Sequence, residues 1–215
     1  CNYRYCWFYL QRPESRLQRP EIRLRRNLVS CDFGITQQRR LPFLFLFLQV
    51  MLLFALRLKV DDEHVALDGN IVDFHGFELP IWYSNIKAEH IATRETSGLF
   101  DVSHMGTFRF TGSKVREWLE SVATQKVTSI PVGRCAYTHF LDKDGFIIDD
   151  MIFAVVSETE ILGVPNASMI DVMWDWFHEC SPADSGVTIE NLSPEMSIIA
   201  LQGPQSKLLL DAAFG

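Results

Sequence analysis

Residues 135–156 read CAYTHFLDKDGFIIDDMIFAVV, and this stretch indicates the fold class. Two apolar runs, 135–141 and 146–156, flank a polar segment, 142–145, which ends in Gly145. Apolar runs joined by a short Asp/Gly segment are typical of a β-hairpin. The sequence therefore predicts two antiparallel strands that are connected by a turn at Gly145.

Single helices and short strands surround this hairpin along the chain. Apolar side chains that recur every three or four residues predict helices over 84–98, from 113 through Val122, and over 167–180. Ser84 and Ser113 are the expected caps of the first two helices. Alternating or short apolar runs predict further strands at 107–111, 161–164, 187–192 and 197–201. This mixture predicts an α+β fold with a largely antiparallel sheet and packed helices.

Charge is divided unevenly along the chain. Of the 20 Lys and Arg and 27 Asp and Glu residues, positions 1–60 hold 11 and 3, and positions 61–215 hold 9 and 24. The second part therefore has a net charge of −15, and its nine basic residues are scattered. Because so acidic a domain repels a phosphate backbone, no nucleic-acid partner is expected.

The cysteines and histidines give no sign of a metal site. Five cysteines, an odd number without CxxC spacing, predict neither a disulfide framework nor a zinc site. His104 has no second ligand at metal-binding spacing, and segment 142–145 lacks the other ligands of a calcium loop. We expect no metal and a reducing compartment, the cytoplasm, with the mitochondrial matrix as the alternative.

Residues 1–56 are interpreted as an extension of a domain that occupies 57–215. Residues 1–40 are Arg-rich and acid-poor, and 41–56 form an apolar run that is shorter than the roughly 20 residues of a membrane-spanning helix. We favour upstream sequence translated from an incomplete gene, with Met51 as a candidate start. A targeting peptide and a short membrane anchor are the alternatives. A membrane partner is not expected for the domain.

Asp149 and Asp150 lie next to each other inside the apolar run 146–156. Side chains alternate along a strand, so one of the two faces inward if the strand is central. An inward carboxylate needs hydrogen-bond donors or a cation, because burial of an unpaired charge is costly or shifts its pKa. A residue kept at that cost is a candidate for a functional site. On the pattern alone, an edge strand or bulge that leaves both carboxylates in solvent is favoured.

Two other side chains have both a functional and a structural interpretation. Asn166 follows a short strand and Pro165, where an Asn usually caps the next helix. The pattern favours this cap over recognition of a ligand by the amide. Tyr137 lies on the strand opposite the Asp pair and can share a face with one carboxylate. Core packing is the commoner role of an aromatic side chain.

Several groups of residues, in order and in spacing, resemble the T-protein (aminomethyltransferase) family of the glycine cleavage system. They are DEH at 62–64, VDFHGFELP at 72–80, WYS at 82–84, GLFDVSHMG at 98–106, GFIIDD at 145–150, VPNA at 164–167 and ALQGP at 200–204. The resemblance covers about residues 57–215. It implies that this domain is the N-terminal, folate-binding part of that family.

Members of this family take an aminomethyl group from the lipoyl arm of the H-protein, release ammonia and pass the one-carbon unit to tetrahydrofolate. The resemblance therefore implies tetrahydrofolate as cofactor and the lipoylated H-protein as partner. It implies that Asp150 is the key carboxylate beside the pterin, where it orients the cofactor and stabilises developing positive charge. Tyr137 and Asn166 match positions that line the folate pocket, and Met105 matches one close to the pterin.

The sequence also departs from the family pattern. Phe77 stands where the family commonly has Trp, and Met169 stands where it has a second Asn. The family's later strings, including a Gly-Tyr-Thr-Gly segment, would follow Gly215, so we expect an incomplete pocket and negligible turnover by these residues alone. The alternatives are a folate-dependent demethylase module of the dimethylglycine or sarcosine type, a non-catalytic folate-binding protein, and an inert fragment.

Overall fold

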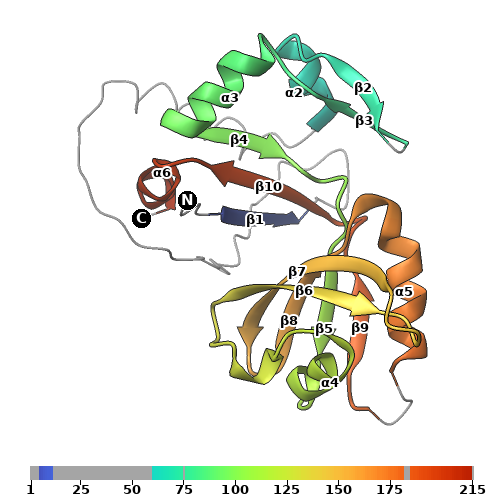
Figure 1. The fold of residues 1–215 in the computed structure, drawn as a ribbon. Coiled ribbons are helices and arrows are strands. Elements are labelled where there is room, and N and C mark those ends of the chain that lie inside the picture. Colours follow the sequence, from blue (N-terminus) through green and yellow to red (C-terminus); the bar gives the residue numbers. More distant parts are fainter. Residues whose placement is uncertain (1–4, 12–59, 75, 182–184, 215) are drawn as a thin grey trace, which may run out of the picture. The chain divides into compact units, whose positions relative to one another are not determined.

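The computed structural model describes residues 5–11, 60–74, 76–181 and 185–214 (Figure 1). Within these residues, no helix is long and apolar enough to cross a membrane. The apolar run 41–56 and the predicted domain boundary at 57 lie outside the described residues. The interpretation of 1–56 as an artefact, targeting peptide or anchor therefore stays a prediction.

The chain divides into two compact units. Unit 1 contains residues 60–101 and 199–214, together with strand β1 (Tyr5–Gln11), and unit 2 contains residues 102–198. Both divisions fall inside the predicted domain 57–215, which the sequence pattern treats as continuous. Each unit is described separately below.

Unit 1 contains a three-stranded sheet, a hairpin and three helices. The sheet has the order β1-β10-β4, where β10 (Met196–Gln202) pairs antiparallel with β4 (Gly98–Asp101). The hairpin joins β2 (Ile71–Phe74) to β3 (Phe77–Pro80). The helices are α2 (Val60–Ala66), α3 (Ile86–Glu95) and α6 (Ser206–Phe214).

Helix α3 differs from the predicted helix in its cap, its end and its environment. Asn85, not Ser84, is the N-cap, and its side chain accepts a backbone N–H of the first turn at 3.0 Å. The Glu89 carboxylate accepts the backbone N–H groups of residues 83–85, which satisfies donors at the helix start. Gly98 begins β4 instead of ending the helix. No residue of α3 is buried, so the recurring apolar side chains that predict this helix do not form a buried face.

Unit 2 is built on a five-stranded antiparallel sheet with the order β6-β7-β8-β5-β9. Its strands are β5 (Phe108–Thr111), β6 (Cys135–Leu141), β7 (Ile147–Ser157), β8 (Glu160–Val164) and β9 (Thr188–Asn191). Its helices are α4 (Val115–Val122) and α5 (Ile170–Glu179), with 3₁₀ turns at Val127–Ser129 and Ala167–Met169. The predicted hairpin is β6–β7, and the α+β class is confirmed.

Two helix starts in unit 2 differ from the prediction. Lys114 is the N-cap residue of α4, and no side chain caps this helix, so Ser113 does not have the expected role. The predicted helix 167–180 consists of a 3₁₀ turn that leads into α5. Such a turn is common at the start of an α-helix, where it tightens the first residues.

The core of unit 2 lies between one face of the sheet and helices α4 and α5. Phe177 of α5 packs against the rings of Phe110 and Phe140 at centroid distances of 5.0 Å, and against Trp118 of α4 at 6.0 Å. All of these side chains belong to one buried apolar cluster. The helices therefore cover one face of the sheet, and the opposite face is left for other contacts.

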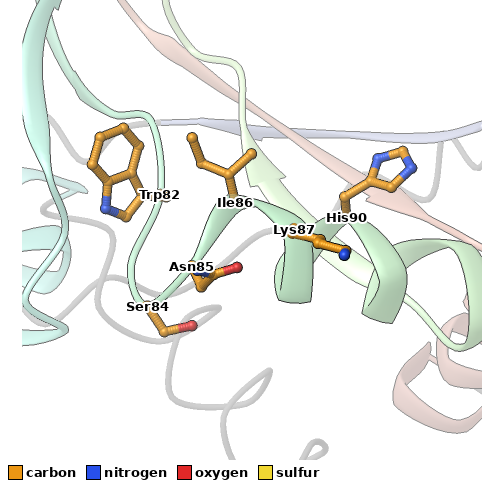
Figure 2. A pocket seen from close by; sticks show the side chains of 6 residues that line it. All are labelled: Trp82, Ser84, Asn85, Ile86, Lys87 and His90. Atoms are coloured by element: carbon orange, nitrogen blue, oxygen red, sulfur yellow. The ribbon is translucent and has the colours of Figure 1, made fainter.

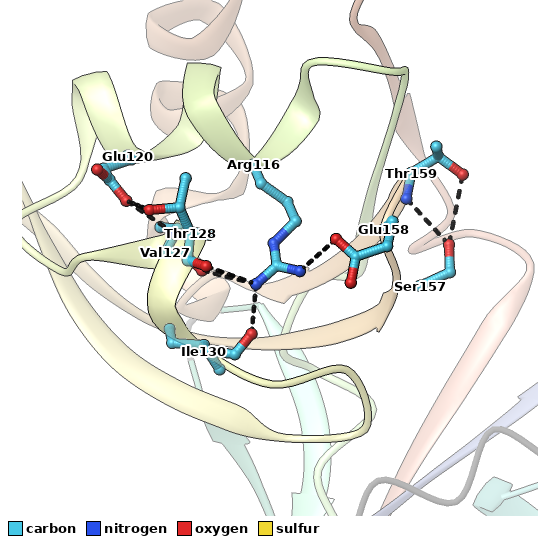
Figure 3. Close-up of polar contacts among 8 residues, drawn as sticks. All are labelled: Arg116, Glu120, Val127, Thr128, Ile130, Ser157, Glu158 and Thr159. Atoms are coloured by element: carbon cyan, nitrogen blue, oxygen red, sulfur yellow. Dashed lines mark hydrogen bonds and ion pairs between the residues drawn. The ribbon is translucent and has the colours of Figure 1, made fainter.

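A buried arginine of α4 forms hydrogen bonds with the turn that follows this helix (Figure 3). Arg116 is 8 % exposed, and its Nη2 donates to the backbone oxygens of Val127, Thr128 and Ile130. Its Nη1 donates to Glu158 at 2.6 Å. The guanidinium thus donates to three carbonyls of this turn, and it stabilises the edge of the core.

Candidate functional site

Strand β7 lies between β6 and β8 and is therefore a central strand. Because its side chains alternate between the two faces of the sheet, the Asp pair is divided. Asp149 faces the core and is only 6 % exposed, whereas Asp150 is half-buried on the opposite face. The interpretation that leaves both carboxylates in solvent is wrong, because β7 has a neighbour on each side.

The strand registers gather the predicted residues around Asp150. In β6, His139 is the cross-strand partner of Asp150, and Tyr137 lies two residues earlier on the same face. On the other side, the register of β7 with β8, continued by two residues, brings Asp150 opposite Asn166. The hairpin and the end of β8 therefore bring the predicted residues Tyr137, Asp150 and Asn166 close together.

Direct contacts join these side chains. The Tyr137 hydroxyl donates to Asp150 Oδ2. The Asn166 Nδ2 donates to Asp149 Oδ1 at 2.7 Å, and lies 3.2 Å from the backbone oxygen of Asp150 and 3.4 Å from its Oδ1. We call Tyr137, Asp150 and Asn166 the open cluster, because the Tyr137 side chain is 51 % exposed.

The structural interpretations of Asn166 and Tyr137 are both wrong. Asn166 stands at the N-cap position of the 3₁₀ turn, but its side chain makes no capping hydrogen bond. Its amide turns to the carboxylates of β7, which are stronger acceptors because they are charged. Tyr137 lies on the exposed face of the sheet and not in the core.

Among the described residues, Met105, the fourth predicted residue, makes no hydrogen bond to the cluster, and its backbone N–H donates to the Val102 oxygen at 3.0 Å. The neighbouring Gly106 N–H donates to the Pro165 oxygen at 3.1 Å, which brings residues 105–106 alongside 165–166. The Met105 side chain is half-buried. The structure thus unites Tyr137, Asp150 and Asn166 by hydrogen bonds, and it connects Met105 to this group only through the bond between its neighbour Gly106 and Pro165.

The open cluster presents hydrogen-bond acceptors. The hydrogen bond to Asp150 raises the pKa of Tyr137 to about 12, and desolvation and the charges of Asp150 and Asp149 act in the same direction. Tyr137 therefore keeps its proton at neutral pH and uses it to hold Asp150. The Asn166 nitrogen points to the carboxylates, so its amide oxygen is left as an acceptor. A ligand with several N–H donors suits this arrangement.

Comparison with known proteins places the chain in a family. The family model described as the GCVT N-terminal domain matches residues 60–215. This chain belongs to that family. GCVT-family relatives include the aminomethyltransferases of Chloroherpeton thalassium, 40 % identical over 147 residues (68 % of this chain, 40 % of the relative), and of Bacillus subtilis, 37 % identical over 154 residues (72 % and 42 %). The predicted resemblance to the T-protein family is confirmed.

A solved structure of the same family has a similar fold. The crystal structure of glycine cleavage system aminomethyltransferase T from Bartonella henselae matches with a TM-score of 0.67 and 26 % sequence identity. The match covers 73 % of this GCVT-family chain and 43 % of that chain. The chain therefore spans about two fifths of the length of the family members that it matches.

Two residues that contact the site in this GCVT-family chain are absent from the set that the resemblance implies. Asp149 bonds to Asn166 from the core side, although the resemblance points only to Asp150. His139 is the cross-strand partner of Asp150, and its ring contacts that of Tyr137 edge to face at a centroid distance of 5.4 Å. A register count through the turn at Gly145 would have found His139. No local signal identifies the partner of Asp149.

Unit 1 contains an open hollow of about 580 Å³ at the start of α3 (Figure 2). Its lining consists of Trp82, Ser84, Asn85, Ile86, Lys87 and His90, so none of the predicted site residues contributes to it. Within the described residues, no group of three or more His, Cys, Asp or Glu side chains is arranged to hold a metal ion. The open cluster therefore remains the best candidate site.

Proposed function

We propose that this chain provides the tetrahydrofolate-binding part of an aminomethyltransferase of the glycine cleavage system. In this reaction, a one-carbon unit moves from the aminomethyl-lipoyl H-protein to tetrahydrofolate, and ammonia is released. Membership of the GCVT family and the names of the relatives support the reaction class. The observation that carries the proposal is the open cluster, where Tyr137 and Asn166 converge on Asp150.

The side chains of the open cluster fit a reduced pterin. The edge of a pterin that carries its amino group and ring N–H groups consists largely of donors. The cluster offers the Asp150 carboxylate, the Asn166 amide oxygen and the lone pairs of the Tyr137 hydroxyl as acceptors. Hydrogen bonds from N–H groups to a carboxylate are about twice as strong as those between neutral groups.

Each residue of the cluster has a separate task in the proposed reaction. Asp150 accepts N–H donors of the ligand, and its negative charge stabilises positive charge that develops next to it. Tyr137 fixes the orientation of the Asp150 carboxylate through its hydroxyl. Asn166 supplies a neutral acceptor beside the charged one. Bound tetrahydrofolate supplies the nitrogen atoms that accept the one-carbon unit.

Calorimetric titration of the 215-residue chain with tetrahydrofolate under anaerobic conditions tests this proposal. Asp150→Ala removes a charged acceptor, so the affinity should fall by about 10-fold to 100-fold. Asp144→Ala is the matched control, because Asp144 is an exposed carboxylate in the turn of the same hairpin, and it should bind as tightly as the unchanged chain. An unchanged chain that binds no tetrahydrofolate, or an Asp150→Ala chain with full affinity, would refute the proposal.

The H-protein partner and the location are also part of the proposal. Binding of lipoylated H-protein to the immobilised chain distinguishes glycine cleavage from the dimethylglycine and sarcosine type of demethylation. The expected negligible turnover of these 215 residues is measured by methylenetetrahydrofolate formation with aminomethyl-lipoyl H-protein. We place the activity in the cytoplasm, with the mitochondrial matrix as the alternative, and localisation of a fluorescent fusion decides between them.

A further inference from the structure

Asp149 is a buried carboxylate that the proposed reaction does not use. It is 6 % exposed on the covered face of the sheet, where Met151 and Phe153 of the same strand belong to the apolar core. Its Oδ1 accepts from Asn166, but its Oδ2 has no hydrogen-bond partner among the described residues. A buried polar atom without a partner costs free energy, so packing alone does not explain this residue.

The geometry of the Asn166 amide shows what Asp149 does. Three acceptors surround Nδ2, namely Asp149 Oδ1 at 2.7 Å, the Asp150 backbone oxygen at 3.2 Å and Asp150 Oδ1 at 3.4 Å. An amide nitrogen has only two hydrogens, so the acceptors compete. The contact with Asp149 is the shortest and the one with Asp150 Oδ1 is the longest, so Asp149 has the largest share in setting the direction of the amide nitrogen. The amide oxygen is then directed away from both carboxylates.

We propose that Asp149 is a positioning residue for the ligand site of unit 2. Its carboxylate fixes the orientation of the Asn166 amide, so that the amide oxygen and the Asp150 carboxylate are both available to N–H donors of the ligand. This inference rests on the proposed function. Without Asp149, the amide nitrogen turns to the Asp150 carboxylate and occupies an acceptor that the ligand needs.

Asp149→Ala tests the proposal because it separates binding from stability. The tetrahydrofolate affinity of the 215-residue chain should fall by about tenfold, the equivalent of one lost hydrogen bond. The thermal midpoint should stay the same or rise, because the unpartnered carboxylate oxygen is removed. Asp149→Asn keeps an oxygen acceptor for Asn166, so it should restore the affinity. A merely structural residue would instead lower the midpoint and the affinity together.

Two further measurements keep the test decisive. In an Asn166→Ala background, Asp149→Ala should cause no additional loss of affinity, because the effect passes through Asn166. In spectra of chain labelled with ¹⁵N-asparagine, the side-chain amide signal of Asn166, assigned with Asn166→Ala, should shift in Asp149→Ala and return in Asp149→Asn. Additive losses of affinity, or an unmoved Asn166 signal, would overturn the proposal. If the unchanged chain binds no tetrahydrofolate, the proposed function is refuted. The spectra still test whether Asp149 orients the Asn166 amide, because they need no ligand.

Discussion

Unit 1 and unit 2 each place a tyrosine hydroxyl in a polar cluster that contains a carboxylate. The two clusters differ in whether hydrogen-bonding groups remain available to a ligand. In unit 1, the Tyr83 hydroxyl lies 2.7 Å from His64 Nδ1, and His64 Nε2 lies 3.1 Å from Asp101 Oδ2. We call these three residues the closed cluster, because His64 is 3 % exposed and both of its nitrogens have protein partners. In the open cluster, acceptors remain for a ligand.

The two tyrosines have a similarly raised pKa for different reasons. Burial is the main cause that raises the pKa of Tyr83 to about 12, and the charges of Asp101 and Glu89 add to it. The hydrogen bond to Asp150 is the main cause for Tyr137, which reaches the same value on an exposed face. The closed cluster therefore raises a tyrosine pKa mainly through burial, and the open cluster does so mainly through one hydrogen bond.

Removal of His64 should have the largest effect on stability. His64→Ala leaves a cavity and removes two hydrogen bonds from the closed cluster, so the free energy of unfolding of unit 1 should fall by about 3 kcal/mol. Hydrogen exchange of backbone amides in α2 and β4 measures this change within unit 1. His90→Ala is the control, because His90 is exposed on α3, and it should change the free energy by less than about 0.5 kcal/mol. Equal effects of both substitutions would contradict the assignment.

The sequence predicts the β6–β7 hairpin well because its signals are local. Alternation, the Asp/Gly turn and the apolar runs all lie within residues 135–156. The division into two units is not local, since unit 1 is closed by pairing of Leu99 in β4 with Leu201 in β10. Pairing between segments so far apart leaves no periodic signal in either segment alone.

The candidate site was predictable only in part for the same reason. Alternation predicts an inward-facing Asp for a central strand, but the sequence does not tell whether β7 is central. The strand order of the sheet gives that answer. Asn166 has the sequence context of a helix cap, but its amide finds a carboxylate 17 residues earlier on the neighbouring strand. The family resemblance identifies Asp150, Tyr137 and Asn166 without that information. Asp149 needs the three-dimensional structure.

Removal of the Asp150 carboxylate should separate the two tyrosines in a titration. In Asp150→Ala, the pKa of Tyr137 should fall from about 12 toward the ordinary value of about 10, because its main cause is lost. The pKa of Tyr83 should remain raised, because burial is its main cause. Ultraviolet absorbance of tyrosinate between pH 9 and about 13 measures both, and Tyr83→Phe and Tyr137→Phe assign the transitions. No change in Asp150→Ala would contradict the hydrogen bond.

The same titration gives the sign of a pH effect on stability. A folded-state pKa of about 12 for Tyr83 exceeds the unfolded value of about 10, so the folded state favours the protonated hydroxyl. The corresponding stability is fully present below pH 10 and is lost as the pH rises through about 12. Unit 1 should therefore lose stability in this range, and Tyr83→Phe should remove that part of the pH dependence.

The smallest effects come from the paired substitutions Tyr83→Phe and Tyr137→Phe, which each remove one hydroxyl and leave the ring. Tyr83 loses a bond to a buried histidine, so the free energy of unfolding should fall by about 1 kcal/mol. Tyr137 is 51 % exposed, and water replaces its hydroxyl at Asp150, so the change should stay below about 0.5 kcal/mol. Chemical denaturation measures the free energy of unfolding of both variants. Tyr137→Phe should also lower the affinity for tetrahydrofolate several-fold, and calorimetric titration measures this loss. If Tyr137→Phe destabilises the chain as much as Tyr83→Phe does, the open cluster stabilises the fold as the closed cluster does. The distinction between the two clusters would then be wrong.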